Sequence, residues 1–210
     1  MSFADMTVRG FLDELASQSP APGGGTASAV AGAMGVGLAA MVAGLTDTSG
    51  MSAEDASRVD EIRQRSKGLI DALLGCADDD TAAFNEVMKA FRLPKATDEE
   101  KRARREAIQL ALKGAVSAPR RTLQLAAEGM QMAAFVAESG NDNAASDAGV
   151  GALLLDTAMG GAIFNMQINL ASIKDQDFVA QMKSEIDRFV KVRDELRQCA
   201  VRSVTRRIGS

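Results

Sequence analysis

The sequence predicts an all-α fold: a single-domain helical bundle of about six to seven helices, with two Gly/Ala-rich helices at its centre. Apolar residues recur three, four or seven positions apart through most of the 210 residues, which is the spacing of an amphipathic helix. No stretch combines alternating polarity with β-branched residues, so we expect no strand. We find no internal repeat and no long linker, and we therefore expect one domain over residues 1–210.

The first half of the chain predicts three helices, over 8–17, 26–45 and 53–91. Thr7 is expected to cap the first helix, and Ser52 with Asp55 resembles a capping box before the third, which Pro94 ends. Between the first two helices lies the loop SQSPAPGGG, whose prolines bar regular structure and whose glycines permit unusual backbone angles. The middle helix is rich in small residues, which let neighbours approach closely, so we expect it to be central.

The second half predicts helices over about 97–117, 119–138, 146–171 and 176–207. Thr97 and Glu100 form a capping box at the first of these, and Pro119 is expected to kink or restart the chain. Gly140 starts a polar loop, GNDNAASD, that leads into the second Gly/Ala-rich helix. Asp175 suits the start of the last helix.

Composition excludes several kinds of chemistry. The chain has no histidine, which rules out a Ser-His-Asp triad, a Cys-His dyad and His-ligated zinc. A net charge of −4 and the absence of Tyr and Trp argue against a nucleic-acid partner. Cys76 and Cys199 lie far apart in sequence, and we expect both to be small buried apolar residues rather than metal ligands. No metal site is expected.

Residues 16–46 carry no charge and have the length of a membrane span. Their Ala/Gly-rich composition is only weakly apolar, so we expect a buried helix and no membrane insertion. The first ten residues lack the pattern of a signal peptide, which predicts a cytoplasmic protein. Each interior glycine costs a helix about 1 kcal/mol relative to alanine, so close packing must offset that cost. So many small faces predict a homodimer or a dimer of dimers.

Two candidate sites lie in the first half. Gly23, Gly24 and Gly25 precede a helix start, where unpaired N–H groups suit an anion or a polar ligand edge; the alternative is a tight structural turn. Asp78, Asp79 and Asp80 are adjacent and cannot all face one site. The apolar stripe places Asp80 beside the buried face, where desolvation favours an acid/base role; the alternative is a solvated acidic patch.

Two further candidates follow. Arg92 and Lys95 flank a rigid turn and are suited to clamp a carboxylate or phosphate, although cations also stabilise a helix C-terminus without any function. The polar segment 140–149 is followed by Asn165 and Asn169, which share one helix face. These amides suit a polar pocket for a heterocycle, or else caps and interhelical hydrogen bonds.

In this order, the motifs resemble the cyclodeaminase/cyclohydrolase family of one-carbon folate metabolism. The resemblance spans nearly the whole chain. PAPGGG lies in the matching segment 11–46, DDDTAAF and RLPK lie in 78–104, and GNDNAASD lies in 140–178; the fourth matching segment is ALKGAVSAPRRTL, 111–123. It implies an all-α, dimeric, metal-independent enzyme that needs no cofactor beyond its tetrahydrofolate substrate. The chain resembles the cyclodeaminase or cyclohydrolase part alone.

Segment 164–178 looks more like the cyclodeaminase members, so the resemblance first implies conversion of 5-formiminotetrahydrofolate to 5,10-methenyltetrahydrofolate and ammonia. The alternative is methenyltetrahydrofolate cyclohydrolase, which opens the methenyl ring to 10-formyltetrahydrofolate. A second alternative is a helical dimer that binds folate or another anion without catalysis.

The reactions that the resemblance implies need groups that move protons or stabilise positive charge, and carboxylates can do both in a chain without histidine. The expected catalytic carboxylates are those of Asp147, Asp80 and Asp175. Arg92 and Lys95 are expected to hold the glutamate tail of the folate. The remaining residues are expected to admit the pterin, to pair with its edge or to order the pocket: Gly23, Gly24, Gly25, Asn141, Ser146, Asn165 and Asn169.

Overall fold

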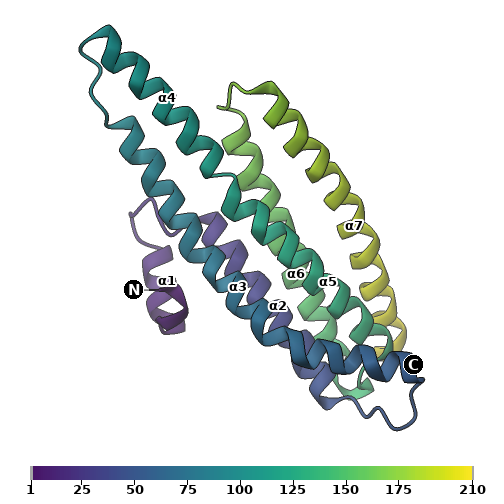
Figure 1. The fold of residues 1–210 in the computed structure, drawn as a ribbon. Helices are drawn as coiled ribbons and strands as arrows, with labels where there is room; N and C mark the ends of the chain where they lie inside the picture. The colour runs from purple at the N-terminus through teal and green to yellow at the C-terminus, as the bar shows by residue number, and fades with distance from the viewer. Residues whose placement is uncertain (1, 210) are drawn as a thin grey trace.

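The computed structural model describes residues 2–209, and every regular element within them is helical. These residues form seven α-helices, whose arrangement is drawn in Figure 1. Their bounds are Val8–Leu15 (α1), Gly24–Leu45 (α2), Ala53–Phe91 (α3), Asp98–Gly114 (α4), Ser117–Ser139 (α5), Ala145–Leu170 (α6) and Gln176–Ile208 (α7). Two short 3-10 helices, Phe3–Asp5 and Asp142–Ala144, precede α1 and α6. The predicted all-α class is confirmed.

The two Gly/Ala-rich helices, α2 and α6, pack against each other at the centre of the bundle, as predicted. α2 also contacts α3 and α5, whereas α6 also contacts α5 and α7. The two helices run antiparallel. At one end Gly24 neighbours Asn165, and at the other end Asn141, which precedes α6, bonds to Leu45.

Glycine allows α2 to approach α6 almost to backbone contact. A Cβ atom added at Gly35 would lie 2.8 Å from the carbonyl oxygen of Gly151 and 2.6 Å from Cγ of Leu155. At Gly161 an added Cβ would overlap the hydroxyl of Ser28. Close packing between two helices therefore offsets the intrinsic helix cost of these glycines, as the sequence predicted.

The predicted N-caps are confirmed. Side chains of Thr7, Ser52, Thr97 and Asp175 accept the expected backbone N–H groups, and Glu100 completes the capping box with Thr97. The prediction for the PAPGGG loop was wrong in one respect, because α2 already begins at Gly24. No described glycine has a positive φ. Of the three glycines in the loop, Gly25 is required for space, because an added Cβ there would overlap Asp80, whereas a Cβ at Gly23 or Gly24 would make only ordinary contacts.

Helix α4 ends and α5 begins on either side of residues 115–116, slightly before the position predicted for the interruption. Pro119 lies in the first turn of α5, where a missing N–H leaves no intrahelical hydrogen bond unmade. A proline is therefore tolerated at this position near the start of α5. Cys76 is buried as predicted, whereas Cys199 is partly exposed.

Two helical segments, Gly24–Leu45 and Asp142–Leu170, are long and apolar enough to cross a membrane by length and composition alone. Half of the most apolar window of each is buried inside the bundle, so both serve as core helices in this structure.

Replacing Gly35 by alanine is expected to destabilise the protein by about 1–3 kcal/mol, because the new methyl group overpacks the α2–α6 contact. Gly68 in α3 provides the matched control, since an added Cβ there meets open space. Gly68→Ala should leave the free energy of unfolding unchanged or raise it by up to about 1 kcal/mol. Urea denaturation measures both; equal stabilities for the two variants would contradict this account of the packing.

Candidate functional site

A cavity of about 400 Å³ opens where α2 begins, against the second half of α3 and the end of α6. Its lining combines a few polar groups with a larger apolar wall, which is typical of small-molecule sites. The residues that line it are Pro20, Ala21, Gly23, Gly24, Gly25, Asp80, Phe84, Val87, Met88, Phe91, Ala115, Asn165, Ile168 and Asn169. Six of the twelve residues predicted for the site are among them.

Asp80 is the carboxylate that the structure places in this cavity. Thr26 Oγ1 donates to Asp80 Oδ2 over 3.1 Å, and the Thr26 N–H also donates to the carboxylate. Burial raises the pKa of Asp80, and the hydrogen bonds from Thr26 oppose that rise. A Cβ at Gly25 would lie 2.3 Å from Asp80 Oδ1, so only glycine leaves room for the carboxylate against α2.

The three adjacent aspartates point in three directions, as their spacing on a helix predicts. Asp78 accepts hydrogen bonds from the Ser2 hydroxyl, at 2.6 Å, and from the Phe3 N–H, at 2.9 Å. Asp79 is exposed and lies 3.8 Å from Arg121. Only Asp80 faces the cavity.

The first turn of α2 forms another part of the cavity wall. Gly23 has no side chain to cap this helix; the Thr26 N–H donates to Asp80, and the N–H groups of Gly24 and Gly25 have no intrahelical partner. They lie at the positive end of the helix dipole, beside the cavity. Such a wall suits a carbonyl oxygen or an anionic group of a ligand.

Asn165 and Asn169 face the same cavity from α6, as their four-residue spacing predicted. The Asn165 amide nitrogen donates to Gly161 O at 2.8 Å, and that of Asn169 donates to Ala115 O and Asn165 O. Both amide nitrogens are thus held by the protein. No hydrogen bond within residues 2–209 uses either amide oxygen, so both are available to N–H donors of a ligand.

The apolar wall comes mainly from one face of α3. Phe84, Met88 and Phe91 follow Asp80 at intervals of four, four and three residues, so they line the cavity in a row. The sequence analysis assigned this wall no ligand-binding role. The signal was present, since residues at this spacing after a facing carboxylate share its side of the helix.

Cations gather beyond Phe91. Arg92 and Lys95 are exposed, as expected for a turn, and neither lines the cavity. Arg104 of α4, which the sequence analysis missed, donates from Nε and Nη2 to Phe91 O at 3.2 and 2.9 Å. Its guanidinium lies 5.8 Å from the Phe91 ring centre. Within the described chain no carboxylate lies within 4 Å of these three cations, so their positive charge is not neutralised.

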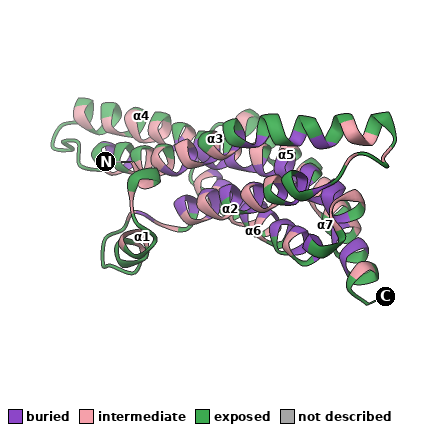
Figure 2. Cartoon of the chain, turned by 90° about the horizontal axis from the view of Figure 1, so that it is seen from below, coloured by how far each residue is buried: buried purple, intermediate pink, exposed green. Residues whose placement is uncertain are grey.

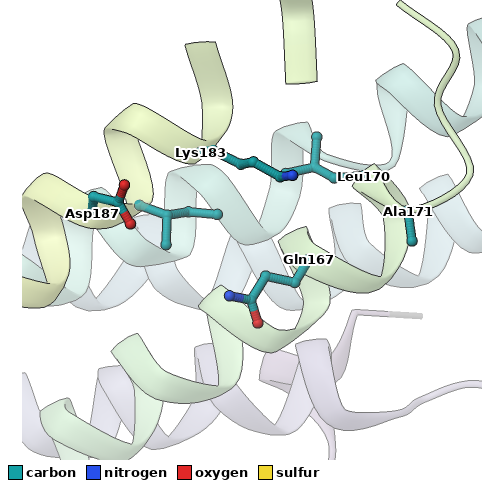
Figure 3. Close-up of a pocket in the computed structure, with 6 residues that line it drawn as sticks. Gln167, Leu170, Ala171, Lys183 and Asp187 are labelled. Carbon is teal, nitrogen blue, oxygen red and sulfur yellow. The ribbon is translucent and has the colours of Figure 1, made fainter. Parts of the chain in front are cut away.

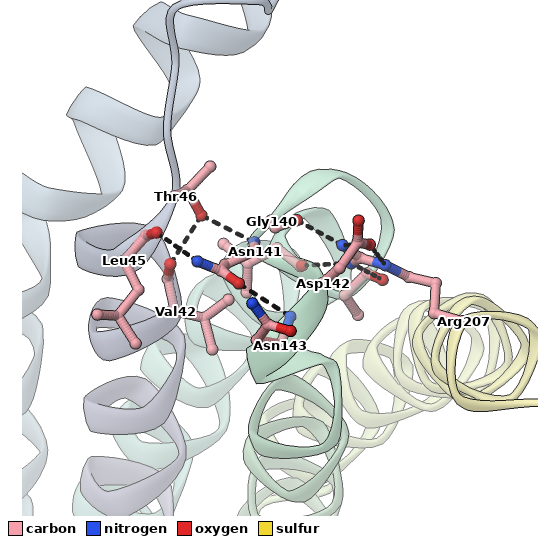
Figure 4. A network of polar contacts seen from close by, with 10 residues as sticks. Val42, Leu45, Thr46, Gly140, Asn141, Asp142, Asn143 and Arg207 are labelled. Carbon is pink, nitrogen blue, oxygen red and sulfur yellow. Dashed lines mark hydrogen bonds and ion pairs between the residues drawn. The ribbon is translucent and has the colours of Figure 1, made fainter.

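The structure does not bring Asn141, Ser146 and Asp147 to this cavity. They lie at the opposite end of α2 and α6, about 30 Å away for a helix of this length. Asn141 Nδ2 donates to Leu45 O at 2.6 Å and the Asn141 N–H donates to Thr46 Oγ1 at 3.0 Å (Figure 4). Asn141 therefore joins the end of α2 to the start of α6.

Arg207 of α7 secures the same turn. It donates to Asp142 Oδ1 at 2.8 Å and to the carbonyl oxygens of Ala137 and Gly140 (Figure 4). Segment 140–147 is thus fixed from two sides. Asp147 itself is only half buried and Ser146 is exposed.

Asp175 acts as a helix cap. It accepts the Phe178 N–H and pairs with Lys113 at 2.6 Å, and the Lys113 hydrogen bond lowers the pKa of Asp175. A carboxylate held ionised in this way is poorly suited to donate a proton at neutral pH. In the structure Asp175 caps α7 outside the cavity, and its catalytic role stays a prediction.

A second cavity, of about 360 Å³, lies on the other side of α6 against α7. Figure 3 shows side chains from the two helices around it, among them Gln167, Lys183 and Asp187. It contains none of the residues predicted for the site.

The comparisons with known proteins identify the class to which this fold and site belong. The family model described as formiminotransferase-cyclodeaminase matches residues 7–188. The chain belongs to that family of folate cyclodeaminases and cyclohydrolases, and the resemblance found in the sequence is confirmed.

Three similar proteins show how this chain relates to members of the family. Methenyltetrahydrofolate cyclohydrolase of Methylorubrum extorquens is 40% identical, over 86% of this chain and 87% of that protein. Formimidoyltransferase-cyclodeaminase of Dictyostelium discoideum is 36% identical over 90% of this chain, which spans only 34% of that larger protein. The solved structure of formiminotetrahydrofolate cyclodeaminase from Thermotoga maritima has a TM-score of 0.85 at 28% identity and covers 96% of both chains.

The raised pKa of Asp80 predicts how the free energy of unfolding changes with pH. The unfolded carboxyl ionises near pH 4, whereas the folded one ionises at a higher pH. Folding therefore becomes less favourable as the pH rises from about 4 through the raised pKa. Asp80→Asn removes this penalty, so its stability relative to wild type should increase over that range and then level off. Urea denaturation between pH 4 and 8 measures the difference; a variant that loses relative stability as the pH rises would contradict it.

Proposed function

We propose that this protein is a methenyltetrahydrofolate cyclohydrolase, and that Asp80 is the group that moves protons. The observation that carries the proposal is a half-buried carboxylate of raised pKa, fixed against the N-terminus of α2 in a cavity of ligand size. No cofactor beyond the tetrahydrofolate of the substrate is part of the proposal.

Two reactions fit the family, and similarity along the chain favours the hydrolytic one. The cyclohydrolase relative is 40% identical over most of both chains, compared with 36% for the Dictyostelium and 32% for the Gallus gallus bifunctional proteins. Cyclodeamination, which segment 164–178 favoured, remains the second candidate because the solved relative of the same fold is a cyclodeaminase.

A carboxylate suits the chemistry of the methenyl group. The substrate carries a positive charge shared between N5, N10 and the bridging carbon, which a nearby carboxylate stabilises in a cavity partly shielded from water. A carboxyl whose pKa is raised toward neutrality holds its proton more readily than an exposed one. Asp80 can therefore act first as a base and then as an acid.

The proposed step balances as follows. Asp80 takes one proton from water as the water oxygen bonds to the methenyl carbon, which gives a neutral tetrahedral adduct. Asp80 then returns that proton to N5 as the carbon–N5 bond breaks. The second water proton leaves to solvent as the formyl carbonyl forms, and the product is 10-formyltetrahydrofolate. The net change is uptake of water and release of one proton.

The cavity also suggests how the folate lies. The amide oxygens of Asn165 and Asn169 and the N–H groups of α2 would hold the polar pterin beside Asp80. The row from Phe84 to Phe91 would contact the aminobenzoyl ring. From Asp80 to Phe91 is about 16 Å along α3, and Arg104 lies just beyond, where a glutamate carboxylate would emerge. The exposed Arg92 and Lys95 would meet further glutamates.

A paired assay tests the activity. Protein-dependent decay of 5,10-methenyltetrahydrofolate is expected in one cuvette, and no methenyl formation from 5-formiminotetrahydrofolate in the other. Asp80→Asn should lower kcat/KM by about 10²–10⁴-fold. The matched control is Asp79→Asn, the neighbouring exposed carboxylate, which should retain wild-type turnover. Methenyl growth with equal ammonia release would make the protein a cyclodeaminase, and saturable folate binding without either activity would favour a binding protein.

A substrate without the glutamate tests the orientation. Arg104→Gln should raise KM about tenfold for the glutamate-bearing substrate, because a charge-assisted hydrogen bond to the tail is lost. The same variant should match wild type on the tetrahydropteroate analogue. Arg102→Gln is the control, since Arg102 is paired with Glu106 at 3.2 Å. An equal KM change on both substrates would remove Arg104 from the tail site.

A further inference from the structure

Thr26 contacts the proposed catalytic carboxylate from the protein interior. It lies in the first turn of α2, is 0% exposed and does not line the cavity. Figure 2 shows α2 mainly in the buried and intermediate colours, whereas the outer sides of α3 and α4 are exposed. The Thr26 hydroxyl lies 3.1 Å from Asp80 Oδ2 and 3.3 Å from the hydroxyl of Thr81, the next residue of α3. The proposed reaction uses the carboxylate but assigns no function to these two hydroxyls.

The direction of these hydrogen bonds follows from the charge of Asp80. An ionised carboxylate can only accept, so the Thr26 hydroxyl must donate to Oδ2. The one proton of that hydroxyl is then used, and its oxygen accepts from the hydroxyl of Thr81. Thr81 is partly exposed, and its side chain makes no other hydrogen bond within residues 2–209. Its hydroxyl is thus available to orient Thr26 toward the carboxylate.

The same contact distinguishes the two oxygens of the carboxylate. Thr26 holds Oδ2, whereas no side-chain donor within the described chain bonds to Oδ1. Gly25 lies against the group, because a Cβ there would come within 2.3 Å of Asp80 Oδ1 and 2.6 Å of Oδ2. The carboxylate is therefore fixed between one glycine and one hydroxyl, and Oδ1 is the oxygen without a side-chain partner.

The charged and titratable groups around Asp80 have partners or surroundings of their own. α2 carries no charged residue, and the α6 wall of the cavity contributes two asparagines, which do not titrate. Asp79 lies 3.8 Å from Arg121 of α5, and Asp78 accepts from the N-terminal segment. Cys76 lies one turn earlier on α3, where burial raises the pKa of its thiol and keeps it neutral.

Thr26 therefore sets the ionisation of Asp80 together with burial. Burial raises the pKa of Asp80, and the side-chain and backbone hydrogen bonds from Thr26 lower it. A hydrogen bond to an ionised acceptor is stronger than one to a neutral acceptor, so the Thr26 hydroxyl favours the ionised form. A base must be ionised before it accepts a proton, so the hydroxyl increases the fraction of Asp80 that is ready to react.

We propose that Thr26 is a positioning residue: its hydroxyl, oriented by Thr81, holds Oδ2 of Asp80 and leaves Oδ1 to take the proton of the attacking water. The inference rests on the proposed function, because Thr26 acts through the carboxylate that this function requires. The proton that Oδ1 takes from water is the one that it returns to N5. Oδ2 accepts from Thr26 before and after each transfer, so the carboxyl group stays in place through both steps.

Removal of the hydroxyl tests this role. Thr26→Val keeps the shape of the side chain and should lower kcat about tenfold near pH 7, which corresponds to one lost hydrogen bond to a charged group. KM should stay unchanged, because Thr26 does not line the cavity. The rising limb of the pH profile of kcat/KM should move to higher pH, because loss of the hydroxyl raises the pKa of Asp80. Thr26→Ser retains the hydroxyl and should restore both kcat and the profile.

Three further variants separate positioning from packing. Thr122→Val removes another buried hydroxyl, which donates to Ala118 O at 3.1 Å on α5, and should retain the wild-type turnover and pH profile. In the Asp80→Asn background, Thr26→Val should cause no further loss, because Thr26 acts only through the carboxylate. Thr81→Val should lower kcat about two- to threefold and move the profile in the same direction. This last variant leaves α2 unchanged and so carries the test if Thr26→Val does not unfold cooperatively in urea.

An NMR titration follows the carboxyl group itself. The Asp80 carboxyl carbon is assigned by its loss from Asp80→Asn, and its titration midpoint should lie at higher pH in Thr26→Val than in wild type. Equal midpoints would overturn the positioning role, as would a folded Thr26→Val that matches wild type at every pH while Asp80→Asn is inactive. A wild type that does not hydrolyse the methenyl compound would instead refute the proposed function, and the titration reports on Thr26 separately.

Discussion

The close approach of α2 to its neighbours is the constraint on which the rest of the structure depends. Where α2 meets α6, Gly35 leaves room for Leu155 and the Gly151 backbone, and Gly161 leaves room for the Ser28 hydroxyl. Where α2 meets α3, Gly25 leaves room for the carboxylate of Asp80. The same packing rule thus produces the core and, at its open end, places an ionisable group partly out of water. A wider helix spacing would remove the desolvation that raises the pKa of that group.

Most of the fold could be predicted because its signals are local. Caps such as Thr97 with Glu100, and the apolar spacing along α3, depend on neighbouring residues alone. The role of Gly25 could not be predicted, because a glycine that admits a distant carboxylate looks the same in sequence as one that permits a turn. The level of Asp147 along the bundle was equally hidden, because polar composition does not tell which end of a helix pair a loop will occupy.

Three adjacent carboxylates show how far environment outweighs residue type. Asp78 secures the N-terminal 3-10 helix, Asp79 stays in solvent, and Asp80 faces the cavity. Their intrinsic chemistry is the same. Desolvation and the donors from Thr26 distinguish Asp80, and these come from α2 rather than from the helix that carries the aspartates. Site chemistry in this bundle therefore arises between helices and not within them.

The unbroken course of α3 has a consequence for how this chain can diverge. Each residue turns a helix by about 100°, so one inserted or deleted residue between Asp80 and Phe91 would rotate the aromatic wall away from the carboxylate. Substitutions along this stretch can be absorbed one at a time, but a change of length cannot. Variation in length should instead collect in the turn between α3 and α4, where the chain is exposed and no helix register is at stake.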